Sequence, residues 1–313
     1  MLKLHYVFCI TVLWATSLCA QPDQVKNEPL TVKVLCFNIR YDNSGDKENA
    51  WPHRKDFAVD LMARGDYDFI NMQEVLIRPN KERCQLEQIK RGLSEKYDVI
   101  VRSRETEENS GESMPIFYRK DRWELDEKEH GIFWLSETPD KVGSLSWDSA
   151  CRRVVTYGLF RHRQTQKTCV VINTHFDHVS EKARQRSAVL ITNRLLRNEK
   201  LTDMPIIFTG DFNVGEEAPV IRYFQGKGAV RLGSELFSLP SEQSLTDTFR
   251  AVYPDGPEQG TFHGFTGTPG KSRIDFIFVS KNIIPTAASI IRTEKDGRYP
   301  SDHFPVDATL LLR

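Results

Sequence analysis

The sequence lacks the features that mark a membrane-spanning protein, a repeat protein or a strongly basic nucleic-acid-binding protein. Its 313 residues carry 43 basic and 43 acidic side chains, so no overall positive charge attracts nucleic acid, although a local basic groove would still allow that partner. No apolar run after residue 21 approaches a membrane span, and no repeat or linker divides the chain. With 39% apolar residues, a single monomeric domain with a substantial core is expected.

Cysteine is scarce, with six residues in the chain. Cys9 and Cys19 fall in the N-terminal segment described below, and four others follow it: Cys36, Cys84, Cys151 and Cys169. The spacing of these four matches no zinc motif, and the first and last lie in apolar runs typical of core residues. A disulfide is allowed in an exported protein but is not implied.

Residues 1–20 have the order of a secretory signal peptide. Lys3 precedes an apolar run over residues 6–18, and Ala20 supplies a small residue near the end. We therefore predict a mature domain over residues 21–313 that is exported to the periplasm or secreted. Lipidation of Cys19 is the less favoured alternative, because Leu18 stands where lipoprotein signals carry a small residue.

The most informative stretch is an apolar run after Pro205 that ends in Gly210-Asp211-Phe212-Asn213. Four apolar residues after a proline predict a buried strand, so a carboxylate and an amide stand at the strand's end. Ligands of sheet proteins bind at such ends. Taken alone, the motif is weak, because Gly, Asp and Asn also form ordinary turns.

Other predicted strands, over residues 30–37, 69–72, 168–172 and 274–279 and near the C-terminus, also meet polar groups at their ends. These groups are Asn38, Glu74, His175, Asp275, and Asp302 with His303. Helices are predicted from residue 51 to 64, 81 to 95 and 181 to 198, whereas residues 104–113 are expected to form an exposed loop and residues 226–259 to be irregular. The aromatic segment 133–147 is interpreted as a connection.

The chemistry of the set points to phosphate esters. Asparagine and carboxylate oxygens without a cysteine cluster suit a hard divalent ion, Mg²⁺ or Mn²⁺. Asp211 with Asn213 would orient an attacking water, and two histidines would stabilise the negative charge of a phosphoryl group in transfer. This pattern predicts metal-assisted hydrolysis of a phosphate ester.

The motifs also resemble, in their order, those of the endonuclease/exonuclease/phosphatase superfamily, from about residue 31 to the C-terminus. The matching segments are Phe37-Asn38-Ile39-Arg40, Gln73-Glu74, Asn173-Thr174-His175, Gly210-Asp211-Phe212-Asn213, Arg273-Ile274-Asp275-Phe276 and Ser301-Asp302-His303-Phe304-Pro305-Val306. Two further segments, residues 49–55 and 133–139, are similar to a bacterial exported branch of metal-dependent hydrolases related to deadenylase-type members. The resemblance implies an α+β fold, a four-layer sandwich of two mixed sheets with helices outside.

The resemblance also implies a role for each matching residue. Metal ligands would be Asn38 and Glu74, with Asp302 nearby. Asp211 would activate water beside Asn213, His303 would face the scissile phosphate and be oriented by Asp275, and His175 would be a second phosphate-facing histidine. Arg40 stands where abasic-site endonucleases carry an aspartate, so it is expected to contact a phosphate oxygen.

Four further residues are candidates for substrate binding that are equally explained by loop hydrogen bonds: Arg152, Asp177, His178 and His263. The substrate stays open between nucleic acid and a small phosphorylated compound, and between a mono- and a diester. The competing hypothesis from another class is a non-catalytic binding module on the same scaffold.

Overall fold

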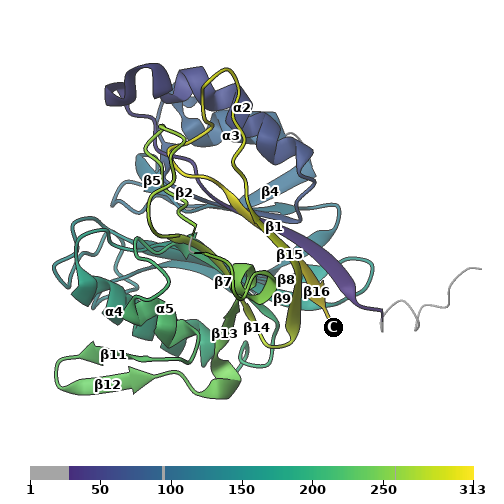
Figure 1. Cartoon of the computed structure of the whole chain (residues 1–313), viewed down its shortest axis with the longest axis vertical. Coiled ribbons are helices and arrows are strands. Elements are labelled where there is room, and N and C mark those ends of the chain that lie inside the picture. Colours follow the sequence, from purple (N-terminus) through teal and green to yellow (C-terminus); the bar gives the residue numbers. More distant parts are fainter. Residues whose placement is uncertain (1–27, 94–95, 258) are drawn as a thin grey trace, which may run out of the picture.

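The computed structural model describes residues 28–93, 96–257 and 259–313, and its centre is a pair of six-stranded β-sheets packed face to face (Figure 1). The predicted signal peptide, with Cys9 and Cys19, lies outside the described residues. Among those described, no helix is long and apolar enough to cross a membrane. The cysteines at 36, 84, 151 and 169 are free thiols.

The first sheet has the strand order β15-β16-β1-β2-β6-β4. Its strands are β1 (Leu30–Asn38), β2 (Phe69–Gln73), β4 (Tyr97–Ile100), β6 (Ile116–Arg119), β15 (Ile283–Ile290) and β16 (Val306–Leu312). Only the central β1–β2 pair is parallel, and it places Asn38 opposite Gln73. Both strands therefore deliver their last residues to the same edge of the sheet.

The second sheet has the order β13-β14-β10-β9-β8-β7. Its strands are β7 (Trp123–Trp134), β8 (Val154–His162), β9 (Thr168–His175), β10 (Ile206–Asp211), β13 (Leu245–Asp247) and β14 (Asp275–Ser280). Strands β9 and β10 are parallel, while β14 is antiparallel to β10. The end of β9, the end of β10 and the start of β14 therefore lie at one edge.

Helices cover the outer faces of both sheets (Figure 1). Helices α2 (Trp51–Arg64) and α3 (Gln85–Leu93) pack on the first sheet, and α4 (Glu181–Ile191) and α5 (Pro219–Phe224) pack on the second. The predicted four-layer sandwich is confirmed. Shorter elements are α6 (Thr248–Val252), the 3-10 turns η1 (Ser44–Asn49), η2 (Lys81–Arg83) and η5 (Ser241–Gln243), and a π-helical turn η4 (Thr192–Leu196).

The core between the sheets is apolar and rich in β-branched residues. Val34, Val171, Ile207 and Val279 are fully buried there, so the central strands have nearly continuous apolar sequences. Burial on this scale is the main favourable term for folding, at roughly 25 cal/mol per Å². The rigid double sheet fixes where its strand ends lie.

Three segments differ from the sequence-based expectation. Residues 104–113 include strand β5 (Gly111–Ser113), which pairs with β3 (Val75–Ile77), and Arg104 is buried rather than exposed. Residues 226–259 contain the hairpin β11 (Ala229–Leu232) and β12 (Glu235–Ser238) as well as β13 and α6. Phe133 and Trp134 belong to β7, not to a connection. These strands are short or strongly charged, so their sequences show little alternation of apolar and polar residues.

Two predicted helices are shorter than expected. The segment 81–95 begins with the turn η2, and α3 starts only at Gln85 because Cys84, with ψ of 115°, is extended. Helix α4 starts at the predicted residue, with Ser180 as its N-cap, and changes to the π-helical turn at Thr192.

Candidate active site

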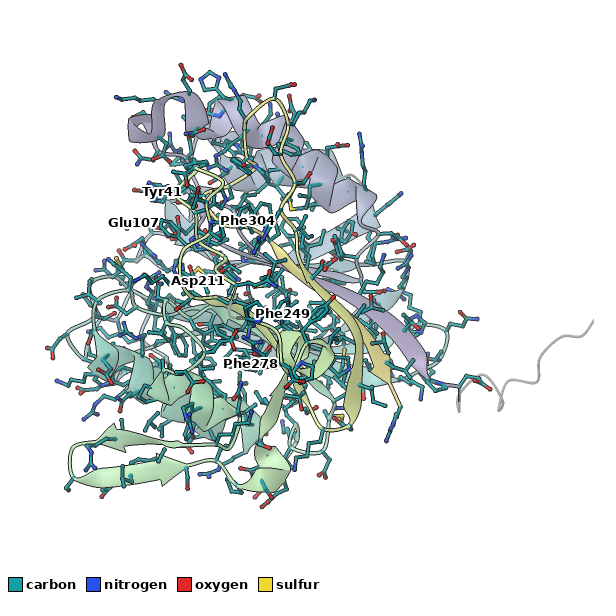
Figure 2. All side chains as sticks on the ribbon, viewed as in Figure 1. Tyr41, Glu107, Asp211, Phe249, Phe278 and Phe304 are labelled. Carbon is teal, nitrogen blue, oxygen red and sulfur yellow. The ribbon has the colours of Figure 1, made fainter. Side chains whose placement is uncertain are left out.

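A pocket of about 470 Å³ opens where the strand ends of both sheets meet. The register of the second sheet brings His175, Asp211 and Asp275 abreast, because Asp211 pairs with the other two on its two neighbouring strands. Asn38 and Glu74 come from the first sheet across the core. Figure 2 shows Asp211 between the helical layers, well inside the molecule.

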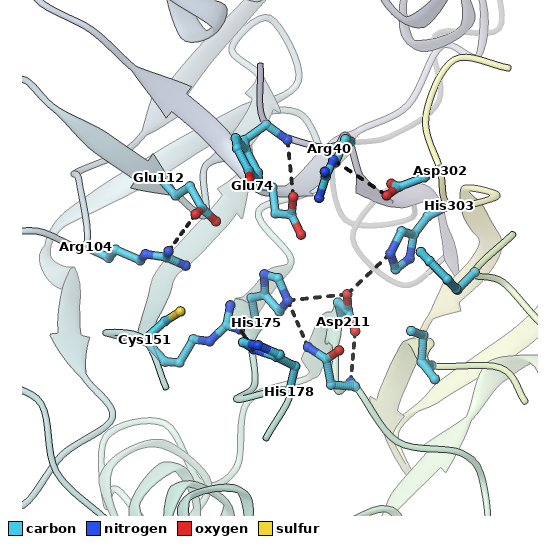
Figure 3. A pocket seen from close by; sticks show the side chains of 15 residues that line it. Arg40, Glu74, Arg104, Glu112, Cys151, His175, His178, Asp211, Asp302 and His303 are labelled. Atoms are coloured by element: carbon cyan, nitrogen blue, oxygen red, sulfur yellow. Dashed lines mark hydrogen bonds and ion pairs between the residues drawn. The ribbon is translucent and has the colours of Figure 1, made fainter. Parts of the chain in front are cut away.

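Asp211 is the centre of the hydrogen-bond network at this edge, and its side chain is buried. The Asn38 amide donates to its Oδ2 over 2.9 Å, and the Asn213 backbone N–H donates to its Oδ1 over 2.8 Å. The Nε2 atoms of His175 and His303 lie 3.4 and 3.8 Å from Oδ2 (Figure 3). Burial, together with the neighbouring Asp275, raises the pKa of Asp211 to about 7. A carboxylate with this pKa is a competent general base near neutral pH.

The side of the His303 ring that points away from Asp211 contacts the carboxylate of Asp275. Its Nδ1 donates to Oδ2 of Asp275 over 2.9 Å, since a carboxylate can only accept. Burial alone would lower the pKa of His303, but Asp275 and Asp211 together raise this pKa to about 10. His303 is therefore an imidazolium at neutral pH.

His175 has the opposite electrostatic state. Burial and the nearby guanidinium of Arg153 hold the pKa of His175 well below its ordinary value, so the ring is neutral. Its Nε2 accepts from the Asn213 amide over 2.9 Å, and this assignment of the amide places the ring proton on Nδ1. Among the described residues this buried Nδ1 has no hydrogen-bond partner. It is free to donate to an oxygen of a bound molecule.

Glu74 faces the pocket with both oxygens in contact with the first sheet. Its Oε1 accepts from the Asn38 amide over 3.1 Å, and its Oε2 accepts from the Tyr41 backbone N–H over 3.2 Å. Arg40 is held by Asp46 through two 2.9 Å hydrogen bonds, and its Nε lies 3.7 Å from Asp302. The guanidinium predicted to contact phosphate is thus already paired with carboxylates.

The donor set at this edge fits a divalent metal ion. Glu74 and Asp302 supply carboxylate oxygens that line the pocket. Asn38 lies beside Glu74: its Nδ2 donates to Glu74, and its Oδ1 accepts from the Arg40 backbone N–H over 3.0 Å. Two groups of side chains could each hold a metal ion, because within each group one carboxylate or imidazole atom per residue lies within 4.8 Å of the others. The first group is Glu74, Glu112 and His175, and the second is Asp211, Asp275 and His303. Burial raises the pKa of Asp302.

Three pocket residues have a left-handed backbone although none is glycine. Arg40, Glu74 and Asn213 have φ angles of 57°, 62° and 56°, and each follows a strand of the central sheets within two residues. This conformation costs a non-glycine residue roughly 1–2 kcal/mol. It turns each side chain out of the strand direction and into the pocket.

The other predicted residues lie in different places. His178 lines the pocket, whereas Arg152, Asp177 and His263 do not. Arg152 donates to the Gly143 carbonyl and to Glu105, and His263 stacks on Phe304 at 4.0 Å between ring centroids. Asp177 accepts hydrogen bonds from two loops: from Ser149, Ala150 and Cys151, and from Val179 and Ser180.

Several lining residues were missed by sequence reasoning. The important ones are Arg104, Glu112 and Arg153, joined by Tyr41, Cys151, Phe262 and Ile274. Arg104 and Glu112 flank a polar, glycine-containing loop, which is the usual composition of exposed segments. Arg153 directly precedes the apolar start of strand β8, as the metal-side residues follow their strands, and this position was the one available signal.

A two-sheet sandwich with carboxylate, amide and imidazole groups gathered at one edge is typical of the superfamily that the motifs resemble. A model of the Endonuclease/Exonuclease/phosphatase family matches residues 35–303, and the chain belongs to this family.

Solved structures agree with this placement. An endonuclease/exonuclease/phosphatase from Bacteroides vulgatus is 33% identical, with a TM-score of 0.77 over 91% of this chain and 100% of that one. A mannosyl-6-phosphatase from Bacteroides thetaiotaomicron is 30% identical, with a TM-score of 0.72 over 89% of this chain and 99% of that one. The catalytic domain of human Nocturnin, at 16% identity and a TM-score of 0.66 over 90% and 94%, shares the fold.

Proposed function

We propose that the protein is a divalent-metal-dependent phosphoesterase in which water attacks a phosphate ester. The observation that carries this proposal is the position of Asp211, a buried carboxylate with a pKa near 7 that lies within 4 Å of two histidines in opposite charge states. A base beside an imidazolium offers both a proton acceptor for the attacking water and a positive charge for the phosphoryl oxygens.

Each group has a distinct role in this proposal. Asp211 accepts a proton from the attacking water, and Asn213 holds Asp211 and His175 in place through its backbone and side-chain N–H groups. Protonated His303 stabilises the charge that develops on the phosphoryl oxygens. His175 donates from Nδ1 to another of those oxygens.

Glu74, Asn38 and Asp302 would hold Mg²⁺ or Mn²⁺, since oxygen donors without thiolates suit a hard ion. When bound, such an ion neutralises charge on the phosphoryl oxygens and polarises the ester. The chain's own contribution is to orient these oxygen donors by the Asn38 and Tyr41 hydrogen bonds to Glu74.

A small phosphorylated substrate is favoured over nucleic acid. The zero net charge gives no general attraction for a polyanion, and the site is a pocket of about 470 Å³. The mannosyl-6-phosphatase at 30% identity acts, by its name, on a phosphorylated sugar. Both observations support a phosphate ester of a small polar molecule.

A turnover screen tests the proposal. Purified protein with Mg²⁺ or with Mn²⁺ would be given sugar phosphates, inositol phosphates, nucleotides, phosphocholine lipids and single- and double-stranded DNA and RNA, and phosphate and chain cleavage would be measured. We expect hydrolysis of a small phosphate ester that stops with EDTA and in Asp211→Ala. The non-catalytic binding module would be favoured instead if none of these compounds is turned over, while one of them binds the parent and Asp211→Ala equally well.

We also propose that the mature protein works outside the cytoplasm. Support comes from the charged residue, apolar run and small residue of the first 20 positions. Small soluble phosphate esters released from external material would reach a protein in that location.

A further inference from the structure

The end of the pocket away from His303 holds two buried arginines that the proposed chemistry does not use. Arg104 and Arg153 are 7% and 5% exposed, and both line the pocket together with His178. In Figure 3, Arg104 lies on one side of His175 and Asp211, and Asp302 and His303 lie on the other. The pocket therefore has a second end, where two guanidinium groups lie with the carboxylate of Glu112.

The guanidinium of Arg153 is only partly satisfied. Its Nη2 donates to Nδ1 of His178 over 3.1 Å, but its Nε and Nη1 have no hydrogen-bond acceptor within the described part of the chain. Its ion-pair contact is an Asp177 oxygen 3.9 Å from Nε. That oxygen already accepts hydrogen bonds from Ser149, Ala150 and Cys151.

Other buried arginines in the same fold are well satisfied. Arg54 donates to four backbone carbonyls, those of Ile39, Arg40, Asn49 and Pro300. Arg273 donates to the carboxylates of Glu216 and Asp247. Arg104 is paired with Glu112 over 2.5 Å. An unsatisfied buried charge is costly, and Arg153 differs from these arginines in that its Nε and Nη1 have no acceptor among the described residues. This difference indicates that the acceptor is a ligand.

The charges around Arg153 are of both signs: the guanidinium of Arg104 lies near it, and so do the carboxylates of Glu112 and Asp211. Burial and the adjacent guanidinium of Arg104 lower the pKa of Arg153, which reflects two cations forced together in a poorly hydrated place. Phosphoryl oxygens accept guanidinium hydrogen bonds with good geometry, and they relieve this repulsion when they bind.

We propose that Arg153, assisted by Arg104 and His178, binds a second phosphoryl group of the substrate, distinct from the one that is hydrolysed beside His303. The inference rests on the proposed phosphoesterase function and narrows it to esters that carry a second phosphate. The second group fixes the substrate across the pocket and presents the first to Asp211.

Binding of inorganic phosphate to metal-free protein in EDTA tests the site without catalysis. By isothermal titration calorimetry, we expect Arg153→Met to weaken phosphate binding 10- to 100-fold, as loss of a charge-assisted contact does. Arg161→Met is the matched control, because Arg161 lies on the adjoining strand β8 and pairs with Glu124 at the surface. Loss of binding in His303→Asn but not in Arg153→Met would overturn the assignment.

Thermal unfolding separates ligand binding from a structural role. If Arg153 binds a ligand and has no structural role, Arg153→Met should leave the Tm of the ligand-free protein unchanged or raise it, because the variant removes an unsatisfied buried charge. A fall of more than about 5 °C, or failure to fold, would instead make Arg153 structural. Arg153→Lys keeps the charge and should retain part of the phosphate affinity.

A third experiment measures the turnover of an inositol monophosphate and of an inositol bisphosphate in the presence of Mg²⁺. We expect the parent to prefer the bisphosphate at least 10-fold in kcat/KM, and Arg153→Met to remove this preference mainly through KM. An equal loss on both esters would place Arg153 on the scissile group and overturn the proposal, while the phosphoesterase function would stand. If neither ester is hydrolysed, the turnover screen described above still decides the proposed function, and the phosphate titration and the melting data decide whether Arg153 binds phosphate.

Discussion

The Nδ1 atom of His303 lies 2.9 Å from Oδ2 of Asp275, and both side chains are almost fully buried. This pair joins the start of β14 to the loop before β16, so it links the two sheets at the edge where the pocket lies. The hydrogen bond fixes the tautomer of His303 and directs its Nε2 toward Asp211, 3.8 Å away.

The Asp275→Asn substitution should change the pH profile of turnover. The carboxylate holds the pKa of His303 near 10 against the effect of burial, so the imidazolium is present below that pH and is lost above it. Without the negative charge the pKa falls, and kcat should decline at a lower pH than in the parent. Measured pH–rate profiles with an unchanged alkaline limb would give Asp275 a structural role only.

The Asp211→Asn substitution should instead lower kcat at every pH, by roughly 100- to 10,000-fold, because an amide cannot accept the water proton. In the parent, Asp211 has a pKa of about 7, so the rate should fall as the pH drops below this value and the base becomes protonated. The variant should lack this acid limb. If the kcat of the variant still falls as the pH drops below about 7, as in the parent, Asp211 is not the base.

Glu74→Gln should weaken Mg²⁺ binding by at least 10-fold, since it keeps the shape of the side chain and removes the charge that a hard dication requires. Glu112→Gln is the matched comparison, because Glu112 lies in the same pocket but is paired with Arg104. Isothermal titration with Mg²⁺ measures both. If the two variants weaken binding equally, the metal is held by the group of Glu74, Glu112 and His175 instead.

Asp177→Asn should destabilise the fold by about 1.5–3 kcal/mol at neutral pH, because the carboxylate accepts several hydrogen bonds from two loops. Burial opposes ionisation, but the Ser180 N–H and the Ser149 hydroxyl, with further donors, lower the pKa of Asp177 overall. The stabilisation is therefore full above about pH 4 and is lost as pH falls through the lowered pKa.

Urea unfolding of parent and variant at several pH values checks this difference in the free energy of unfolding. The two curves should converge in acid. A variant with parental stability and a raised KM would return Asp177 to the substrate-binding role predicted from the sequence.

Cleavage of the N-terminal segment should leave a mature protein that begins near Gln21. The apolar run is followed by small residues, which signal peptidases require. Intact-mass measurement of protein from the native host decides the point. A mass increment of lipid size on Cys19 would show the lipoprotein alternative to be right.

The resemblance of the motifs to the family implied the sandwich. The main residues of its edge could be predicted from the strands themselves, because buried parallel strands such as β10 are apolar runs with a sharp polar end. Asp211 could be placed for this reason, and the register that sets it beside His175 follows from the parallel pairing. Sequence reasoning failed at Arg104 and Glu112. Their segment is as polar as an exposed loop, and only the tertiary pairing of β3 with β5 places it against the pocket.

The left-handed backbone at Arg40, Glu74 and Asn213 has a consequence for substitutions at these positions. Glycine adopts that conformation without steric penalty, so replacing any of the three by glycine relieves local strain while it deletes a guanidinium, a carboxylate or an amide from the pocket. The same change would remove the Asp46 pair of Arg40 or the hydrogen bonds that Glu74 accepts from Asn38 and Tyr41. The strained backbone and these side-chain contacts therefore belong together, and the fold holds the strain because the contacts offset it.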